Sequence, residues 1–269
     1  MPGRQSISER GSGMPQTERQ DNDKTTPIVI VTGGSRGIGA SLVERLHREG
    51  FGVLFTHAQS PQEAETLEQT FSDDGPVVRG LQCDVANPDA STCIFDAAEA
   101  LGDPVALVNN AGITGGLGPL AELGDNELDR VIAVNLAAPA RLCREAARRW
   151  QNHASRKSIV NISSVAARTG SPNEYVVYAA TKAGLEALTR GLAKELAGAN
   201  ILVNAVSPGT TDTTLHARSG EPGRAKRIAE KIPLGRAGQP DEIANAIAWL
   251  LSTETSYITG SVIEVTGGL

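Results

Sequence analysis

Short apolar runs alternate with helix-like segments from residue 27 to the end of the sequence. The apolar runs are rich in β-branched residues, which is typical of strands buried on both faces of a sheet. The segments between them repeat apolar positions every three or four residues, as amphipathic helices do. This alternation predicts repeated βαβ units around a parallel sheet.

The pattern predicts seven strands and six helices. The strands are expected at 28–32, 53–56, 77–83, 106–109, 158–163, 201–206 and 262–265. The helices are expected near 37–50, 61–72, 88–101, 125–151, 176–198 and 240–252. No repeat of fixed period interrupts the series, so residues 25–269 are expected to form a single α/β domain with helices on both faces of the sheet.

The first 24 residues have a different composition, rich in Gly, Ser, Gln and charged residues and nearly free of large apolar ones. Such a segment cannot bury enough apolar surface to offset the entropy of ordering. We therefore expect residues 1–24 to be a disordered N-terminal tail. Met14 lies inside it and is a second candidate for the first residue of the protein.

Composition excludes several classes of function. The chain has 269 residues, a net charge of -6 and only 3% aromatic residues, which argues against a nucleic-acid partner. Its three cysteines form no Cys-x-x-Cys motif, so neither a disulfide framework nor a metal site is expected. No window reaches eighteen apolar residues, so we expect no membrane partner and a cytoplasmic location.

A Gly-rich turn, Thr-Gly-Gly-Ser-Arg-Gly-Ile-Gly at 32–39, follows the first strand and opens the first helix. Gly33, Gly37 and Gly39 would let the backbone turn tightly and approach a pyrophosphate at the helix N-terminus. This context predicts a dinucleotide site. The alternative is a turn that only lets the helix pack on the strand.

The same turn also matches the nucleophile elbow of a serine hydrolase, read as Gly33-x-Ser35-x-Gly37. An elbow serine needs a downstream acid and histidine, and His216 is the one natural partner. An elbow normally follows several strands, whereas Ser35 follows the first. The hydrolase remains a remote alternative.

The end of the second strand bears on cofactor choice. NAD-binding folds often place an acidic residue there that bonds the ribose 2′-hydroxyl. Residues 50–62 contain no acidic residue, and the next one is the glutamate at 63. Thr56 and His57 occupy the strand end, and Arg36 sits in the Gly-rich turn. Because guanidinium groups bind phosphate well, NADP(H) is favoured, while NAD(H) remains possible and Arg36 could simply be a solvated arginine.

A second candidate site combines Ser164, at the end of the fifth strand, with Tyr178 and Lys182 on the long helix that follows. Positions i and i+4 share one face of a helix, so the phenol and the ammonium can point together. That face would look into the crevice at the carboxyl ends of the strands, where open α/β sheets bind ligands. The Tyr-x-x-x-Lys spacing alone is a weak signal.

Taken together, the motifs resemble the short-chain dehydrogenase/reductase family from about residue 28 to residue 268. The shared landmarks are Thr32-Gly33-x-x-x-Gly37-Ile38-Gly39, Asp84-Val85, Asn109-Asn110-Ala111-Gly112, Asn135, Ser164, Tyr178-x-x-x-Lys182, Pro208-Gly209 and Gly267-Gly268. The resemblance implies a three-layer Rossmann fold and an NAD(P)(H)-dependent oxidoreductase that interconverts a carbonyl and a secondary alcohol. A catalytically silent NADP(H)-binding or regulatory protein of the same fold is the alternative.

The resemblance also implies roles for the catalytic residues. Tyr178 would exchange a proton with the substrate oxygen, Ser164 would orient that oxygen, and Asn135 would continue a water relay. Lys182 would hold the nicotinamide ribose. An ammonium about 4 Å from the phenol, at an effective dielectric near 20, would lower the tyrosine pKa by roughly three units. Because the spacing to Tyr178 is one residue longer than usual, Ser163 is an alternative serine, and Asn135 could instead cap a helix bulge.

The remaining expected cofactor contacts also follow from the resemblance. They are Ser35 and Ile38 in the Gly-rich turn, Asp84 and Val85 at the adenine, Asn110, Ala111 and Gly112 near the adenosine ribose, and Pro208, Gly209, Thr211 and Thr213 at the nicotinamide end. Two residues depart from the family pattern. Thr211 replaces a branched aliphatic residue, and Thr266 replaces an aspartate and puts a C-terminal turn contact in doubt.

The resemblance also implies a substrate-closing loop at about 212–232. Its basic residues Arg224, Lys226 and Arg227 are interpreted as a solvated helix face, with an acidic substrate as the alternative. Fatty-acyl, xenobiotic and sugar carbonyls all remain open as small-molecule substrates. Small residues on several faces of the helix at 176–198 predict packing against another helix. The family resemblance implies that this helix and its neighbour pair across a subunit interface, so a homotetramer or homodimer is expected.

Overall fold

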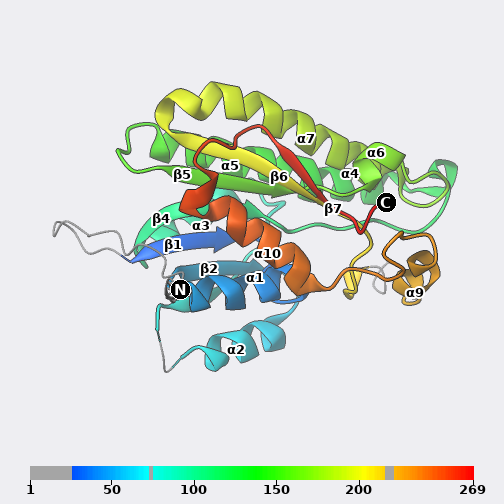
Figure 1. Cartoon of the computed structure of the whole chain (residues 1–269), viewed down its shortest axis with the longest axis horizontal. Coiled ribbons are helices and arrows are strands. Elements are labelled where there is room, and N and C mark those ends of the chain that lie inside the picture. The colour runs from blue at the N-terminus through cyan, green and yellow to red at the C-terminus, as the bar shows by residue number, and fades with distance from the viewer. Residues whose placement is uncertain (1–25, 73–74, 216–220) are drawn as a thin grey trace, which may run out of the picture.

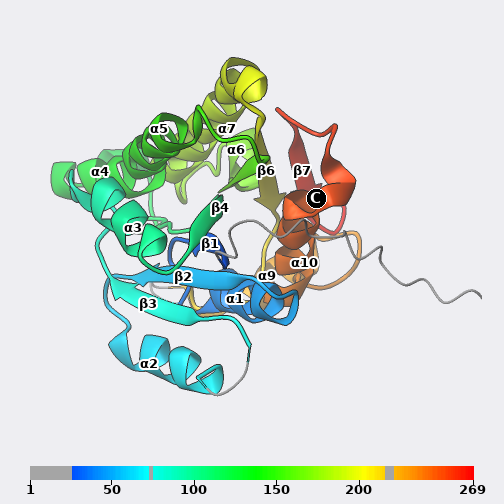
Figure 2. The same cartoon turned by 90° about the vertical axis from the view of Figure 1, so that its left-hand side faces the viewer.

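Seven parallel strands form one sheet in the computed structural model, which describes residues 26–72, 75–215 and 221–269. The strands are β1 (Pro27–Val31), β2 (Gly52–His57), β3 (Val78–Gln82), β4 (Asp103–Asn109), β5 (Lys157–Ile162), β6 (Ile201–Pro208) and β7 (Val262–Val265). Their order is β3-β2-β1-β4-β5-β6-β7 (Figure 1 for β2 to β7; β3 lies beside β2 in Figure 2). The predicted Rossmann sheet is therefore confirmed, and predicted strand ends differ from the observed ones by three residues at most.

Nine α-helices connect the described strands or cap the sheet. They are α1 (Gly37–Arg48), α2 (Pro61–Thr70), α3 (Ala90–Glu99), α4 (Asp125–Ile132), α5 (Ala138–Trp150), α6 (Ala166–Thr169), α7 (Val176–Leu196), α9 (Arg224–Ala229) and α10 (Pro240–Leu251). Short 3-10 turns occur at Leu120–Glu122, Ala197–Ala199 and Thr253–Thr255. The helices α6 and α9 and these turns were not predicted, because a segment of one or two turns is too short to reveal a period.

Each face of the sheet packs on its own layer of helices, as expected for a three-layer fold (Figure 2). Along β1, Ile28 and Ile30 face a core shared with α3, α5 and α7. The alternating residues Val29 and Val31 face the opposite core, shared with α1, α2 and α10. Successive strand side chains point to opposite faces, so one apolar run fills both cores.

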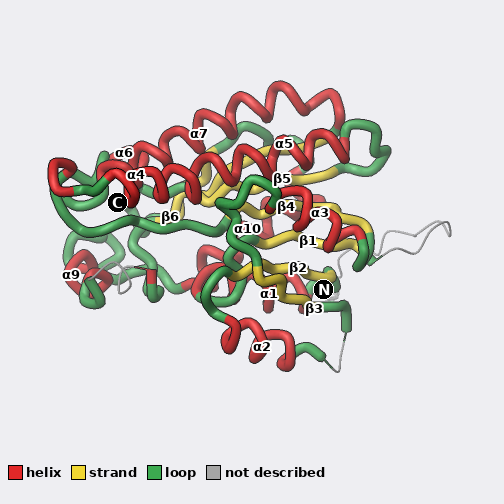
Figure 3. Tube along the Cα trace, turned by 180° about the vertical axis from the view of Figure 1, so that it is seen from behind, coloured by secondary structure: helices red, strands yellow, loops and turns green. Residues whose placement is uncertain are grey.

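The helix predicted at 125–151 is interrupted by a π-helical turn at Ala133–Ala137. The prediction of one continuous helix was therefore wrong. The interruption contains Asn135, whose side chain bonds to the backbone of Ile113 instead of facing solvent. A single π turn inside an α-helical run often marks a functional position. Both halves of the broken helix lie alongside α7 (Figure 3).

A chain of buried amide groups ties α7 to the centre of the sheet. Asn109 Nδ2 donates to Asn161 Oδ1 at 2.8 Å, and Asn161 Nδ2 donates to Thr189 Oγ1 at 2.9 Å. The thiol of Cys143 lies 3.4 Å from the same Asn109 amide, and burial raises its pKa to about 12. Buried polar groups that bond to one another fix a single arrangement. The helix that carries Tyr178 is thereby held in register with β4 and β5.

Replacing Thr189 with valine tests this link. Valine keeps the shape of threonine but leaves the Asn161 amide without its acceptor, so we expect Thr189→Val to lower the free energy of unfolding by about 1–3 kcal/mol. Urea unfolding measures the change. Thr66→Val is the matched control, because the Thr66 hydroxyl bonds the Gln62 carbonyl on an exposed helix face; it should change stability by less than about 0.5 kcal/mol. Equal effects would contradict the role given to the buried chain.

Candidate functional site

A cleft of about 830 Å³ opens at the carboxyl ends of the strands. It is lined by every residue proposed above for catalysis or cofactor binding except Asn135, which is fully buried behind it. The lining thus brings together segments that are more than a hundred residues apart in the sequence. Parallel strands all end at the same edge of a sheet, which explains the convergence.

The Gly-rich turn at 32–39 forms one wall of the cleft. Gly33 and Gly37 have positive φ angles of 65° and 54°, a conformation that glycine adopts without strain. A Cβ on Gly39 would lie 2.3 Å from the Gly33 carbonyl oxygen, so this position has no room for a side chain. The first turn of α1 contains no acidic residue, which leaves its N-H groups and positive dipole end available to an anion.

The fourth strand holds this turn in place. The Asn110 side chain donates from Nδ2 to the carbonyl oxygens of Thr32 and Gly33, both at 2.9 Å. In return, the Thr32 hydroxyl oxygen accepts from the backbone N-H groups of Asn110 and Ala111 at 3.0 Å. These four bonds join the ends of β1 and β4 at the mouth of the cleft.

Ser164 and Ser163 point in different directions. The Ser163 side chain is 2% exposed and donates to Glu186 Oε1 at 2.8 Å, so it is committed to the protein interior. Ser164 Oγ accepts from the backbone N-H of Ala166 at 3.2 Å and lines the cleft with Tyr178, whose pKa it acts to lower. The geometry therefore favours Ser164 over Ser163 as the serine that meets a ligand.

The electrostatics of Tyr178 and Lys182 differ from the expectation. The Lys182 Nζ atom lies 5.6 Å from the centre of the Tyr178 ring and donates to the Ile162 carbonyl oxygen at 2.6 Å. Burial raises the pKa of Tyr178 above its usual value, with no lowering effect from the lysine. Burial also lowers the pKa of Lys182 to about 8. The predicted lowering of the tyrosine pKa by Lys182 was therefore wrong, because desolvation of the buried phenol dominates its pKa.

Asn135 sits directly behind the cleft. Its Oδ1 accepts from the Ile113 N-H at 2.9 Å, and its Nδ2 donates to the Ile113 carbonyl at 2.7 Å. A Cβ added to Gly112 would lie 3.4 Å from Asn135 Oδ1 and 3.5 Å from Lys182 Nζ, so both side chains approach that glycine. Asn135 therefore ties the π turn to the loop after β4 and also lies near the lysine. Among the described residues its side chain makes no hydrogen bond to the bulge itself, so the capping alternative gains no support.

The far end of the cleft holds Arg36, Thr56 and His57. The Thr56 hydroxyl accepts from the Gly33 N-H at 3.2 Å, which ties β2 to the Gly-rich turn. His57 is only 8% exposed, and its Nδ1 has no hydrogen-bond partner among the described residues. Ser35 pairs with Ser60 at 2.7 Å. This corner therefore combines a guanidinium, an imidazole and three hydroxyls.

Asp84 and Val85 line the cleft beside this corner. The Asp84 carboxylate accepts from Arg130 at 2.8 Å and from the Ala86 N-H at 3.0 Å. Burial acts to raise the pKa of Asp84, but these bonds lower it overall. The carboxylate therefore stays ionised at neutral pH. The contact with Arg130 on α4 was not foreseen.

The opposite wall is formed by the segment after β6. Thr211 bridges to Gly238, and its hydroxyl donates to the Gly209 carbonyl at 3.3 Å. Thr213 packs against the Gly-rich turn, since a Cβ on Gly37 would lie 3.3 Å from its methyl group. Thr266 accepts from the Gly268 N-H at 3.3 Å, so the threonine makes a C-terminal turn contact of its own.

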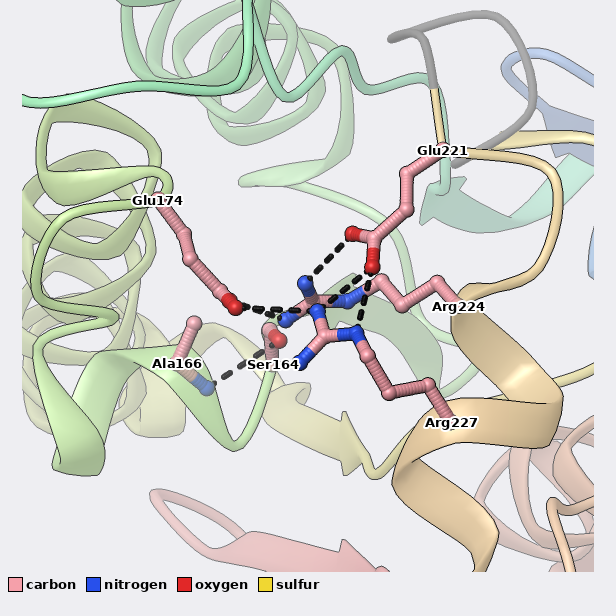
Figure 4. Close-up of polar contacts among 6 residues, drawn as sticks. All are labelled: Ser164, Ala166, Glu174, Glu221, Arg224 and Arg227. Carbon is pink, nitrogen blue, oxygen red and sulfur yellow. Dashed lines mark hydrogen bonds and ion pairs between the residues drawn. The ribbon is translucent and has the colours of Figure 1, made fainter.

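Sequence reasoning missed an ion-pair ring beside the cleft, formed by Glu174, Glu221, Arg224 and Arg227 (Figure 4). Arg224 lies 2.6 Å from Glu174 and 3.0 Å from Glu221, and its side chain is only 12% exposed. The interpretation of Arg224 as part of a solvated helix face was therefore wrong. The ring joins α9 to the turn before α7, and no local pattern links segments so far apart. Part of the expected substrate loop, residues 216–220, lies outside the described residues, as do residues 1–25.

Two other kinds of feature are absent from the described residues. Within the ranges described, no group of three or more His, Cys, Asp or Glu side chains is placed to hold a metal ion. In the same ranges, no helix is both long and apolar enough to cross a membrane.

Comparisons with known proteins agree with this geometry. Residues 33–269 match a sequence family described as Enoyl-(Acyl carrier protein) reductase. The chain is 42% identical over 244 residues to the uncharacterised oxidoreductase YgfF of Escherichia coli, covering 90% of this chain and 99% of that protein. It is 38% identical over 243 residues to the 3-oxoacyl-[acyl-carrier-protein] reductase FabG of Pseudomonas aeruginosa, covering 90% and 96%.

A solved structure extends the likeness to three dimensions. A short-chain dehydrogenase/reductase from Serratia marcescens superposes with a TM-score of 0.82 at 35% sequence identity, covering 91% of this chain and 98% of the other. Fold, cleft and sequence motifs thus agree with one another. The chain belongs to the short-chain dehydrogenase/reductase family of oxidoreductases.

Proposed function

We propose that the protein is an NAD(P)(H)-dependent oxidoreductase that interconverts a carbonyl and a secondary alcohol, with Tyr178 as general acid and base. The observation that carries the proposal is the meeting of Ser164, Tyr178 and Lys182 in the cleft whose other wall is the Gly-rich turn. A catalytically silent binding protein would have no need to keep all three side chains in that cleft.

The cleft fits a nicotinamide dinucleotide. Glycines at 33, 37 and 39 keep its floor free of side chains, and the N-terminus of α1 offers unpaired N-H groups to a pyrophosphate. Asn110, Ala111 and Gly112 would flank the adenosine ribose, while Pro208, Gly209 and Thr213 would flank the nicotinamide. When bound, the dinucleotide supplies or accepts the hydride.

The chain's own residues would donate the proton and orient the substrate oxygen. Burial keeps the Tyr178 phenol protonated across neutral pH, so it is ready to donate to a carbonyl oxygen. Ser164, which lines the cleft with the phenol, would orient that oxygen. Lys182 holds its charge below a pKa of about 8 and would bind the ribose. A water relay through Asn135 remains a prediction.

The cofactor is proposed to be NADP(H) rather than NAD(H). Residues 56–60 line the cleft and include no carboxylate, whereas Arg36 and the unpaired Nδ1 of His57 offer donors to a 2′-phosphate. A charged phosphate is bound well by such groups. The serine-hydrolase alternative gains no support, because Ser35 pairs with Ser60 and not with a base, and His216 lies outside the described residues.

The substrate is proposed to be a small ketone or its alcohol. Relatives named as acyl-carrier-protein reductases favour fatty-acyl carbonyls, without excluding sugars or xenobiotics. The proposed assembly is a homotetramer or homodimer through α7, where no atom of the described residues lies within 4 Å of a Cβ built on Gly191. Free thiols at all three cysteines support a reducing, cytoplasmic location.

Removal of the proton donor should abolish turnover. We expect Tyr178→Phe to lower kcat for ketone reduction by at least about 10²-fold, because general acid catalysis contributes that much or more. NADPH oxidation against ketones, aldehydes and quinones measures it. Tyr257→Phe is the control, since Tyr257 is fully exposed and should leave turnover unchanged. Unchanged turnover in Tyr178→Phe would rule out the mechanism.

The phosphate preference can be tested without turnover. We expect Arg36→Ala to raise the Kd of NADPH by roughly 10- to 100-fold, the value of a lost charged hydrogen bond, and the Kd of NADH far less. Fluorescence titration of the bound dinucleotide measures both. Arg48→Ala on the outer end of the same helix, where the side chain bonds the Glu44 carbonyl, should change neither. Equal losses for the two dinucleotides would show that Arg36 does not recognise phosphate.

The buried charge of Lys182 predicts a pH-dependent stability. The folded pKa of about 8 lies below the unfolded value near 10.4, so the unfolded state binds the proton more tightly in between. The free-energy cost of burying the protonated ammonium therefore lowers stability in full below pH 8, and this cost disappears as the pH rises to about 10.4. We expect the Tm of Lys182→Met, relative to wild type, to fall by a few degrees from pH 7 to pH 10. Lys194→Met, on the exposed face of α7, should show no such trend; a matching trend would contradict the argument.

A further inference from the structure

The ion-pair ring of Glu174, Glu221, Arg224 and Arg227 fixes one positive charge at the wall of the cleft. Arg224 bonds one glutamate through Nη2 and the other through Nη1, and its guanidinium carbon lies 5.1 Å from the centre of the Tyr175 ring. Arg227 bonds the second oxygen of each glutamate, at 3.0 and 2.6 Å. A guanidinium held by two carboxylates and an aromatic face cannot swing away into solvent.

Arg224 differs from the other three members of the ring. Among the described residues, it is the one ring member that lines the cleft together with Ser164 and Tyr178. Its side chain is also the least exposed of the four, whereas Arg227 is 46% exposed. A desolvated charge acts on its surroundings more strongly than one in water. The ring therefore presents a fixed cation to the cleft through Arg224 alone.

Other charged groups around the Tyr178 phenol are committed elsewhere. Besides Arg224, the charged side chains that line its cleft are Arg36, Asp84, Glu127, Arg130 and Lys182, and α6, which packs against α7, adds Arg168. Arg36 belongs to the Gly-rich turn, where it is proposed to bind the cofactor phosphate. Lys182 donates to the Ile162 carbonyl, and Arg168 donates to the Leu269 carbonyl. Glu127 accepts from the Gly116 N-H, and Arg130 pairs with Asp84.

We propose that Arg224 is a positioning residue whose fixed charge stabilises the Tyr178 phenolate left when the proton passes to the substrate oxygen. The carboxylates of Glu174 and Glu221 hold the Arg224 guanidinium in position. The inference rests on the proposed function for its catalytic meaning. Burial raises the pKa of Tyr178, and both the Ser164 hydrogen bond and the charge of Arg224 lower it. Arg224 thus supplies part of the electrostatic stabilisation of the phenolate that was expected from Lys182.

The ionisation of residue 178 can be measured directly. A 3,5-difluorotyrosine placed at position 178 has a more acidic phenol, so it titrates while the protein remains folded, and its phenolate absorbance gives the midpoint. We expect Arg224→Gln to raise that midpoint by roughly one pH unit. Arg224→Lys should restore most of the shift, because it restores the charge. Circular dichroism at each pH verifies that the variants are folded.

Arg227→Gln is the matched control, because it removes the same charge from the same ring but not from the cleft wall. A purely structural ring predicts equal shifts in the two glutamine variants, and that result would overturn the proposal. A shift at least several-fold larger in Arg224→Gln supports it. Ketone reduction by the unlabelled protein tests the proposed function separately from the electrostatic role of Arg224. A shift without any wild-type turnover would refute the proposed function and leave the electrostatic role of Arg224 standing.

Discussion

The amide of Asn110, bonded to the carbonyl oxygens of Thr32 and Gly33, is the interaction on which the site depends. The sheet order changes direction between β1 and β4, so their two connections leave on opposite sides and a crevice opens there. Without a link across that point, the Gly-rich turn would be free to shift relative to the fourth strand. Four short hydrogen bonds between the strand ends fix the wall on which a pyrophosphate would rest.

The catalytic side of the cleft is fixed in a different way. Tyr178 and Lys182 come from one long helix, and that helix is held to the sheet by the buried amides of Asn109 and Asn161 and the hydroxyl of Thr189. The two sides of the cleft are therefore set by separate polar networks in a mostly apolar interior. Neighbouring asparagines of β4 and its turn serve both networks, since Asn109 points inward and Asn110 points to the Gly-rich turn.

Local patterns in the sequence were enough to predict much of this arrangement. Strand positions, the Gly-rich turn and the i, i+4 spacing of Tyr178 and Lys182 all depend on short-range geometry, which explains why they were found. The π turn at Asn135 and the direction of the Lys182 ammonium depend on partners supplied by the folded chain, such as Ile113 and Ile162. The ion-pair ring is formed by two segments from different parts of the chain, so no periodicity in the sequence indicates it.

The buried thiol of Cys143 has a practical consequence. Because its pKa is about 12 and it lies within the amide chain behind the sheet, its thiolate is nearly absent in the folded protein at neutral pH. A thiol reagent can reach it only when that interior opens. The rate at which Cys143 is alkylated therefore reports how often the core opens. The exposed Cys93 reacts from the native state and serves as an internal standard.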